Sequence, residues 1–462
     1  MQQYLTIWDL VLTPIYLIIL IVIAKRIRNK NHPEGDPLHK YYLPGLYVRF
    51  GGAVFIGLIY QFYYGGGDTF LYFEYAKIVN SSFDDSVITW LKLLSRTSPE
   101  VDPYLYKYAS SIEYYSDPPT YAVVVITALL GLLTFNTYVP TALLFAFIAY
   151  TGIWAMYRTF CKAFPNRYKA LAIAFLFVPS VFVWGSPIFK DTVCMFGLGW
   201  MTYTSFRIFV DKDFSIKNIL LLILSFYLIG IIKVYILLAF LPSLFLWLLL
   251  MYSHKIRSIA LRIIIGLGIG GIVVIGFIYF ANSFSANLNR YSLDAITATA
   301  ETTRSWIASS GDEGATYDLG AFDPSIVGVA TKLPAGIAVT LFRPFLWEVK
   351  KPIQLLSSLE GLAFIILTLM TFYRNGVFGT FRLILANPNL IFFFTFSMIF
   401  AFAVGLSTGN FGTLSRYKIP CMPFFAALLI ILYFSKQKRL KQKQVNPSSS
   451  DQVLTNNASY LH

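Results

Sequence analysis

Residues 8–24 read WDLVLTPIYLIILIVIA, an apolar run that is followed at once by KRIRNK at positions 25–30. A run of this length can cross the hydrocarbon core of a bilayer as one helix, and basic residues gather at the cytoplasmic ends of such helices. No basic segment precedes the run and no small-residue cleavage site follows it, so we expect no cleavable signal peptide here. We expect a first transmembrane helix that starts outside and ends in the cytoplasm.

Similar apolar runs recur along the chain, in which 56% of the residues are hydrophobic and only 13% are charged. This balance is far from that of a soluble domain. The runs are continuous and lack the alternation of apolar and polar residues that membrane β-strands need. The predicted fold class is all-α, a polytopic transmembrane helical bundle of about 11–13 spans. After the first run, the others lie near 50–64, 121–134, 139–157, 170–187, 192–210, 218–231, 234–252, 260–281, 355–373, 388–406 and 418–434.

The formal net charge of +14 is a value that nucleic-acid-binding proteins also show. The Lys and Arg residues of this chain, however, stand beside the apolar runs, as the positive-inside rule requires, so we expect no nucleic-acid partner. The cysteines are isolated and the histidines lie in basic or terminal stretches. Neither a disulfide framework nor a zinc site or His-based triad is therefore expected. These residues are Cys161, Cys194, Cys421, His32, His39, His254 and His462.

The basic loops assign the polar segments of the chain to two sides of the membrane. Residues 1–435 form the predicted transmembrane catalytic domain, and 436–462 form a disordered basic cytoplasmic tail. Two larger external loops are expected at about 65–118 and 282–354. Within the second of them, 327–346 is expected to be an interfacial helix or a further short span. The charged residues that fall on the external side are Asp68, Lys190, Asp191, Lys233, Arg343, Glu348 and Arg416.

One part of this topology stays open. Two full crossings between residues 118 and 158 would put the basic loop at Arg158 on the wrong side of the membrane. Either one of the two apolar runs is re-entrant, or the segment 65–118 dips into the membrane.

The first polar motif is GGGDT at 65–69, directly after the second apolar run. Three glycines let the backbone turn sharply and approach a ligand closely, and they leave the Asp68 carboxylate at the water boundary. Such a carboxylate can take a proton from a hydroxyl group or bind a metal ion. A flexible helix exit with a solvated acid explains the same residues.

The second motif is PSVFVWGSPIFKD at 179–191, where Pro and Gly interrupt an apolar run just before Lys190 and Asp191. An acid at the start of the next helix suits the positive end of the helix dipole. The structural alternative is an N-terminal acid beside a lysine that extends to the interface.

The third motif is LFRPFLWE at 341–348. Arg343 can grip a phosphate with two parallel hydrogen bonds, and the ring of Trp347 can receive an isoprenoid chain or a sugar face. An interfacial anchor of aromatic residues and arginine is the alternative.

The fourth motif is GNFGTLSRYKIP at 409–420, just before the last apolar run. Arg416 and Lys418 oppose the positive-inside rule if this segment is external. Binding of an anionic ligand would explain basic residues on the external side. Tyr417 lies between them in the sequence and would be next to such a ligand.

Taken in order, the four motifs resemble those of GT-C glycosyltransferases, the polytopic envelope enzymes that use lipid-linked sugars, and of the related Wzy-like oligosaccharide polymerases. The matching patterns, across about residues 50–425, are GGDT-x-x-Y, PS-x-x-x-W-x-S-x-x-x-KD, RPF-x-WE and GT-x-x-RY-x-x-P. The resemblance implies a GT-C-like fold in the bacterial inner membrane and transfer of a sugar from a polyprenyl-phosphate donor to a glycan or lipid acceptor in cell-envelope polysaccharide biosynthesis. The family often has a pair of acids where this chain has only Asp68, which leaves dependence on a divalent metal, Mg or Mn, open.

Glycosyl transfer with inversion needs a base for the acceptor hydroxyl and cations for the departing phosphate. Asp68 is the candidate base, and Asp191 and Glu348 are candidate catalytic residues that orient the cations or the acceptor. The candidate substrate-binding residues are Lys190, Lys233, Arg343, Trp347, Arg416 and Tyr417.

Three alternative functions remain at this stage, and one of them is a structural or assembly protein, since fold does not fix function. A Wzy-like polymerase would use the same site to join repeat units of a surface polysaccharide. A transporter or flippase for a lipid-linked or anionic substrate would instead place charged residues at both faces and at the midplane of the membrane.

Overall fold

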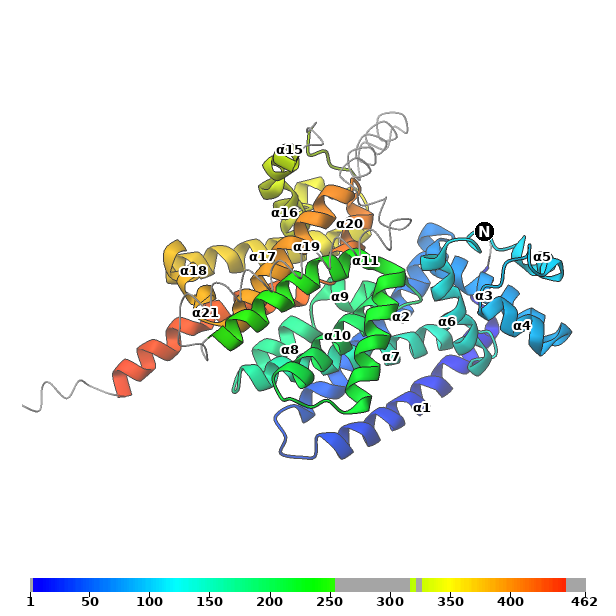
Figure 1. Cartoon of the computed structure of the whole chain (residues 1–462), viewed down its shortest axis with the longest axis horizontal. Coiled ribbons are helices and arrows are strands. Elements are labelled where there is room, and N and C mark those ends of the chain that lie inside the picture. Colours follow the sequence, from blue (N-terminus) through cyan, green and yellow to red (C-terminus); the bar gives the residue numbers. More distant parts are fainter. Residues whose placement is uncertain (1–2, 254–315, 321–325, 446–462) are drawn as a thin grey trace, which may run out of the picture.

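The computed structural model describes residues 3–253, 316–320 and 326–445 (Figure 1). Within these ranges the chain is helical and contains no strand, only an isolated bridge between Thr316 and Asn410. The longer helices are α1 (Ile7–Asn31), α2 (His39–Ile59), α3 (Asp68–Asp85), α6 (Pro118–Leu133), α7 (Tyr138–Ala163), α10 (Lys190–Phe209), α11 (Ile216–Ser253), α17 (Pro352–Asn375), α19 (Pro388–Ser407) and α21 (Met422–Val445). The shorter ones are η1 (Tyr60–Tyr64), α4 (Val87–Leu94), η2 (Pro103–Leu105), α5 (Tyr106–Ala109), α8 (Tyr168–Leu176), α9 (Pro179–Trp184), α15 (Ile326–Thr331), α16 (Leu333–Phe342), η4 (Leu346–Glu348), α18 (Val377–Leu385) and α20 (Phe411–Tyr417).

Six helices of the described residues are long and apolar enough to cross a membrane, and the bent pair α20 and α21 makes a seventh. The prediction of an all-α, multi-pass membrane protein is thus confirmed. The number of such helices is smaller than the 11–13 spans expected, because several predicted runs fold into short or broken helices. The run at 260–281 lies outside the described residues, as does most of the predicted loop 282–354.

The centre of the bundle is the pair α7 and α10, whereas α1 runs along one edge (Figure 1). Gly152 of α7 and Gly199 of α10 face each other so closely that a Cβ atom on Gly199 would lie 2.1 Å from the Gly152 carbonyl oxygen. Small residues allow this approach of two backbones, which is a common way to pack helices in a membrane. The two central helices are therefore tightly packed, and this packing holds the charged residues at their ends in place.

Helix α6 explains how the chain passes from residue 118 to 158. At its start, the Thr120 hydroxyl accepts a hydrogen bond of 2.7 Å from Lys190, the first residue of α10. At its far end, Thr134 contacts Thr141 in the first turns of α7 at 2.6 Å. Both ends of α6 thus lie beside the N-termini of α10 and α7. Of the two runs between 118 and 158, α7 therefore runs through the bundle, whereas α6 does not pass from one end of it to the other.

The predicted external loop 65–118 is mostly helical, because α3, α4, η2 and α5 occupy it and form, with α6, a lobe at the right of Figure 1. In the C-terminal half, α16 packs on α19, and the Thr340 hydroxyl donates to the Ala401 carbonyl at 2.7 Å. At the end of the described chain, α21 continues to Val445, so the helix includes the first residues of the predicted tail.

Helix α11 folds back on itself at Lys233, whose backbone angles of φ −147° and ψ 74° are not helical. Lys212, just before the helix, donates a 2.6 Å hydrogen bond to the hydroxyl of Tyr252 near its end. The two limbs of α11 therefore return to the same end of the bundle. Lys233 lies at the opposite end, at the tip of the bend.

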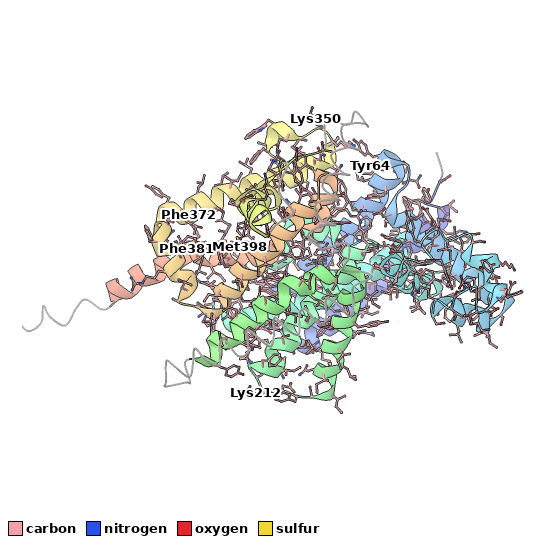
Figure 2. The ribbon with its side chains drawn as sticks, turned by 45° about the horizontal axis from the view of Figure 1, so that its top comes forward. Tyr64, Lys212, Lys350, Phe372, Phe381 and Met398 are labelled. Carbon is pink, nitrogen blue, oxygen red and sulfur yellow. The ribbon has the colours of Figure 1, made fainter. Side chains whose placement is uncertain are left out.

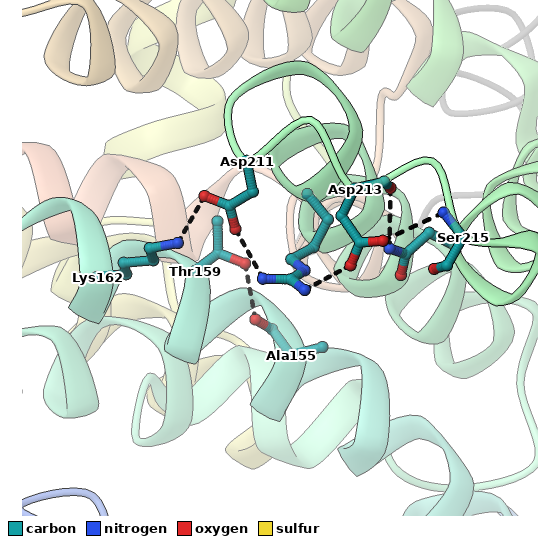
Figure 3. Close-up of polar contacts among 8 residues, drawn as sticks. Ala155, Thr159, Lys162, Asp211, Asp213 and Ser215 are labelled. Carbon is teal, nitrogen blue, oxygen red and sulfur yellow. Dashed lines mark hydrogen bonds and ion pairs between the residues drawn. The ribbon is translucent and has the colours of Figure 1, made fainter.

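The basic end of the bundle carries an ion-pair network around the turn between α10 and α11 (Figure 3). Asp211 accepts from Lys162 of α7 at 2.5 Å and from Arg207 of α10 at 2.9 Å, and Arg207 also pairs with Asp213. Figure 2 shows Lys212, in this turn, at the edge opposite to Tyr64, which precedes the glycine turn. Because α10 has 20 residues, its two ends are about 30 Å apart, which is the thickness of a bilayer core.

Candidate functional site

The three glycines of the first motif form a tight turn between η1 and α3. Gly65, Gly66 and Gly67 have φ angles of 69°, 148° and 128°, a region that other residues rarely adopt. A Cβ atom on Gly67 would lie 2.6 Å from the ring of Tyr60, so the turn is also packed against the start of η1. The sharp turn expected from the glycines is present, and it makes Asp68 the first residue of α3.

Arg416 joins Asp68 to a second acid. Its guanidinium donates to the Asp68 carboxylate at 2.8 Å and lies 3.5 Å from the Asp191 carboxylate. Both acids stand in the first turn of a helix, α3 and α10, where the helix dipole favours a negative charge. The two acids differ in access, because the Asp68 side chain is 50% exposed and that of Asp191 only 1%. Asp68 is thus the carboxylate that a ligand from outside can reach.

Lys233 extends this arrangement into a chain of alternating charges. At the bend of α11, it pairs with the buried Asp191. Its Nζ atom also lies 3.9 Å from the centre of the Tyr417 ring, a cation–π contact. We call the series Asp68, Arg416, Asp191 and Lys233 the charge chain. It combines residues of four helices that are far apart in the sequence.

Lys190 flanks the charge chain. Besides the hydroxyl of Thr120, it has Asp117 at 3.6 Å. Asp117 was not singled out in the sequence, although the order Asp-Pro-Pro-Thr at 117–120 is typical of a helix start and could have drawn attention to it. Its side chain accepts from the Thr120 backbone N–H at the start of α6.

Two polar cavities lie on the two sides of Arg416 and Tyr417. The first, of about 260 Å³, has Arg416 in its wall together with Tyr60, Tyr64, Trp184, Gln354 and Asn410. The second, of about 130 Å³, has Tyr417 in its wall together with Asp117, Lys190 and Lys233. We call them the aromatic cavity and the lysine cavity. Because consecutive residues of α20 face the two cavities, the charge chain lies between them.

A groove of about 550 Å³ leads away from the lysine cavity, with which it shares Gly230 and Ile231. It runs between α10 and the two limbs of α11, and nearly all its wall is apolar, with residues such as Met201, Phe226 and Leu244. The bend at Lys233 creates this groove, since the two limbs of α11 diverge from it. The apolar groove thus adjoins the cavity that has Lys190 and Lys233 in its wall.

The third motif forms a separate group. Arg343 holds Glu348 with hydrogen bonds of 3.0 Å from Nε to both carboxylate oxygens, and Glu348 also accepts from the Phe345 N–H at 2.8 Å. Trp347 is 80% exposed. Within the described residues, the hydrogen bonds and ion pairs of these side chains do not reach the charge chain. Arg343 approaches α20 at the ring of Phe411, whose centre lies 5.2 Å from the central carbon of the guanidinium.

The Arg343 pair changes the proton affinity of Glu348. Burial raises the pKa of the Glu348 carboxyl, but the hydrogen bonds from Arg343 and from the Phe345 N–H lower it by more. The pKa of Glu348 is therefore below its ordinary value, and the group is charged at neutral pH. This arrangement fits an ion pair that shapes the segment before α17.

Sequence reasoning missed the buried charges that hold the broken helix α9. Arg49 of α2, fully buried, donates to the Gly185 carbonyl at the end of α9 at 2.9 Å. Glu360 of α17 accepts from the Ser180 N–H at its start at 2.7 Å, and Lys418 lies 3.9 Å from Glu360. Each charge has the sign that suits its end of the helix dipole. Arg49 and Glu360 thereby fix the segment that carries Trp184, Lys190 and Asp191.

The donor set around Arg416 does not form a metal centre. Asp68 and Asp191 are the acids of the charge chain, and Arg416 already lies between them. Nowhere in the part of the chain that the structure describes do three or more His, Cys, Asp or Glu side chains gather in a way that could hold a metal ion. The residues present here do not fit a resident Mg²⁺ or Mn²⁺ ion.

No protein-family profile, no curated protein and no solved structure matches this chain.

Proposed function

We propose that this chain is an integral membrane glycosyltransferase. It moves a sugar from a polyprenyl-phosphate-linked donor to an acceptor at the external face of the bacterial cytoplasmic membrane. The observation that carries the proposal is the joining of an apolar groove to a small cavity with two lysines, next to a charge chain whose exposed end is a carboxylate. The fold alone would not distinguish this function from others.

The groove and the lysine cavity together suit an amphiphile. An isoprenoid chain gains free energy from burial against an apolar wall, whereas its phosphate needs cations and hydrogen-bond donors. Lys190 and Lys233 supply cations in the cavity that adjoins the groove. A soluble nucleotide sugar would have no use for the groove, so the observation favours a lipid-linked donor.

The charge chain suits the chemistry of transfer with inversion. Asp68 takes the proton of the acceptor hydroxyl while the acceptor oxygen forms a bond to the anomeric carbon of the donor sugar. The bond from that carbon to the phosphate oxygen breaks, and the phosphate leaves with the electron pair. When Asp68 becomes neutral, Arg416 loses one of its two carboxylate partners, so its charge becomes available to the leaving phosphate.

The distribution of charge supports the external location. Basic residues follow α1 at 25–30 and surround the α10–α11 turn, which marks that end as cytoplasmic under the positive-inside rule. The charge chain lies at the other end of α10. A donor carried by a membrane lipid reaches that side without a cytosolic nucleotide.

The buried residues Arg49, Glu360 and Lys418 favour a second candidate, a transporter or flippase, because intramembrane charges often mark a transport path. Arg49 and Glu360, however, each hydrogen-bond a backbone group of α9. That contact explains them as fixed parts of the scaffold. A Wzy-like polymerase uses the same transfer chemistry but joins oligosaccharide repeat units, so it remains a variant of the proposal.

The test compares the native host with a strain in which the chromosomal copy carries Asp68→Asn. A transferase predicts that a lipid-linked sugar accumulates on the external leaflet, where periodate added to intact cells oxidises it. A flippase predicts accumulation on the cytoplasmic leaflet, protected from periodate. If the lipid-linked sugars of the two strains are the same, the proposed function is wrong. A strain with Glu74→Gln, a partly exposed acid on the same helix, serves as the control.

A further inference from the structure

The aromatic cavity has a composition that differs from that of the groove. Three of its wall residues present rings, which are Tyr60 and Tyr64 at the two ends of η1 and Trp184 at the end of α9. The start of α17 and the segment around α20 supply amide and hydroxyl groups, including Gln354, Asn410 and Thr413. The wall contains a single aliphatic side chain, Ile353. The wall also carries two cations, Lys351 and Arg416, and offers much less apolar surface than the groove, so a lipid chain suits the groove better.

Rings and amides in one cavity suit a carbohydrate. The C–H faces of a sugar pack on aromatic rings, while its hydroxyl groups exchange hydrogen bonds with amide and hydroxyl side chains. The cavity of about 260 Å³ is slightly smaller than typical ligand pockets, which start at about 300 Å³, so it fits a terminal sugar rather than a long chain.

The rings are held in place and are linked to Arg416. Phe189 lies beneath the guanidinium of Arg416, 4.2 Å from ring centre to the central carbon. The same ring contacts Tyr60 at 5.7 Å and Trp184 at 6.3 Å between ring centres. Tyr60 in turn packs against Gly67 of the glycine turn that precedes Asp68. A sugar on these rings would thus lie beside the Asp68–Arg416 pair.

We propose that the aromatic cavity is the acceptor site and that the acceptor is the terminal sugar of a glycan rather than a lipid. This inference rests on the proposed function, because it assumes that Asp68 receives the proton of an acceptor hydroxyl. The donor approaches through the lysine cavity, and the acceptor approaches from the other side of Arg416.

The test places a photo-reactive residue in the cavity. Tyr64→p-benzoylphenylalanine, irradiated in the native host, inserts into nearby C–H bonds, and mass spectrometry of the purified protein identifies the adduct. The control carries the same residue at Phe381, which is 44% exposed compared with 41% for Tyr64 and lies on the other side of the molecule (Figure 2). We expect hexose or hexosamine masses on the Tyr64 variant and none on the Phe381 variant.

A second measurement separates this inference from the proposed function. Binding of radiolabelled farnesyl phosphate to the purified protein reports on the groove and the lysine cavity. We expect Tyr64→Ala to leave this binding unchanged and to raise the KM for the acceptor about 2- to 10-fold, the range that corresponds to one aromatic contact.

The outcomes are distinct. Two outcomes would overturn the acceptor assignment and leave the transferase proposal standing. In both, the protein binds farnesyl phosphate; the Tyr64 variant then gives either a lipid adduct or no adduct above the Phe381 control. Failure of both farnesyl phosphate binding and sugar capture would overturn both. Sugar capture that also occurs at Phe381 would show nonspecific labelling and count against the cavity.

Discussion

The guanidinium of Arg416 lies 2.8 Å from the carboxylate of Asp68, although 348 residues separate them in the chain. Asp68 begins α3 and Arg416 stands in the last turn of α20, so each charge suits its own helix end. The pair lies at the boundary between the two polar cavities. Its partly exposed carboxylate and largely buried guanidinium are the groups on which most of the predictions depend.

Asp68→Asn should reduce sugar transfer by about 10²- to 10⁴-fold, because an amide cannot accept the proton of the acceptor hydroxyl. Binding of farnesyl phosphate should persist, since the two lysines of the other cavity are untouched. Single-turnover rates with a lipid-linked sugar, together with the binding measurement, check both parts. Full activity of the Asn variant would end the assignment of Asp68 as the base, and Glu74→Gln is the control on the same helix.

Arg416→Lys should keep partial activity, and Arg416→Ala should keep very little. Lysine retains the charge but loses the planar fork that reaches Asp68 and Asp191 together. The Ala variant also leaves the buried Asp191 with one cation fewer. Removal of one partner from a buried ion pair typically costs about 3–5 kcal/mol of folding free energy.

Turnover and thermal unfolding of both Arg416 variants in detergent, at equal membrane levels, measure these effects. Lys418→Ala is a useful comparison, because Lys418 is a buried base of the same segment that pairs with Glu360 and not with the charge chain. Parental turnover in the Arg416→Ala variant would remove Arg416 from the site.

Gly67→Ala should abolish transfer by displacing the turn. The φ of 128° at Gly67 strains any other residue, and the added Cβ atom would collide with the ring of Tyr60 at 2.6 Å. Gly51→Ala, in the same helix–turn unit, meets no heavy atom within 4 Å and should leave activity unchanged. Activity and melting temperature of the two variants test the contrast, which fails if both behave alike.

The Arg343–Glu348 pair should stabilise the protein in a pH-dependent way. The folded-state pKa of Glu348 is lowered, so the pair contributes fully above the ordinary value of 4.5 and its contribution is lost as the pH falls through the folded-state pKa. We expect the melting temperature of the parent to exceed that of Glu348→Gln at neutral pH. The difference should shrink in acid, and a constant difference would contradict this account.

The apolar runs were sufficient to predict the helices, because in lipid a backbone segment must satisfy its own hydrogen bonds and a helix does so within itself. Each predicted run that falls in the described residues lies in one helix, in one limb of α11, or in a broken pair such as α8 and α9. The turn at 65–67 was also predictable from the local sequence, because glycine adopts positive φ angles such as those found there without steric cost. The placing of charges at helix ends followed from the same local pattern.

Which charges meet was decided only by tertiary structure. Arg343 and Arg416 look alike in the sequence, yet Arg343 pairs with Glu348 five residues away, while Arg416 reaches Asp68 and Asp191 on other helices. The choice depends on how α3, α10 and α20 pack, on the bend at Lys233 and on the return of α6 to the side from which it starts. The local sequence of a segment determines whether it forms a helix. Contacts between helices that are distant in the sequence depend instead on how their side chains pack across the interfaces, and a local sequence pattern does not contain this information.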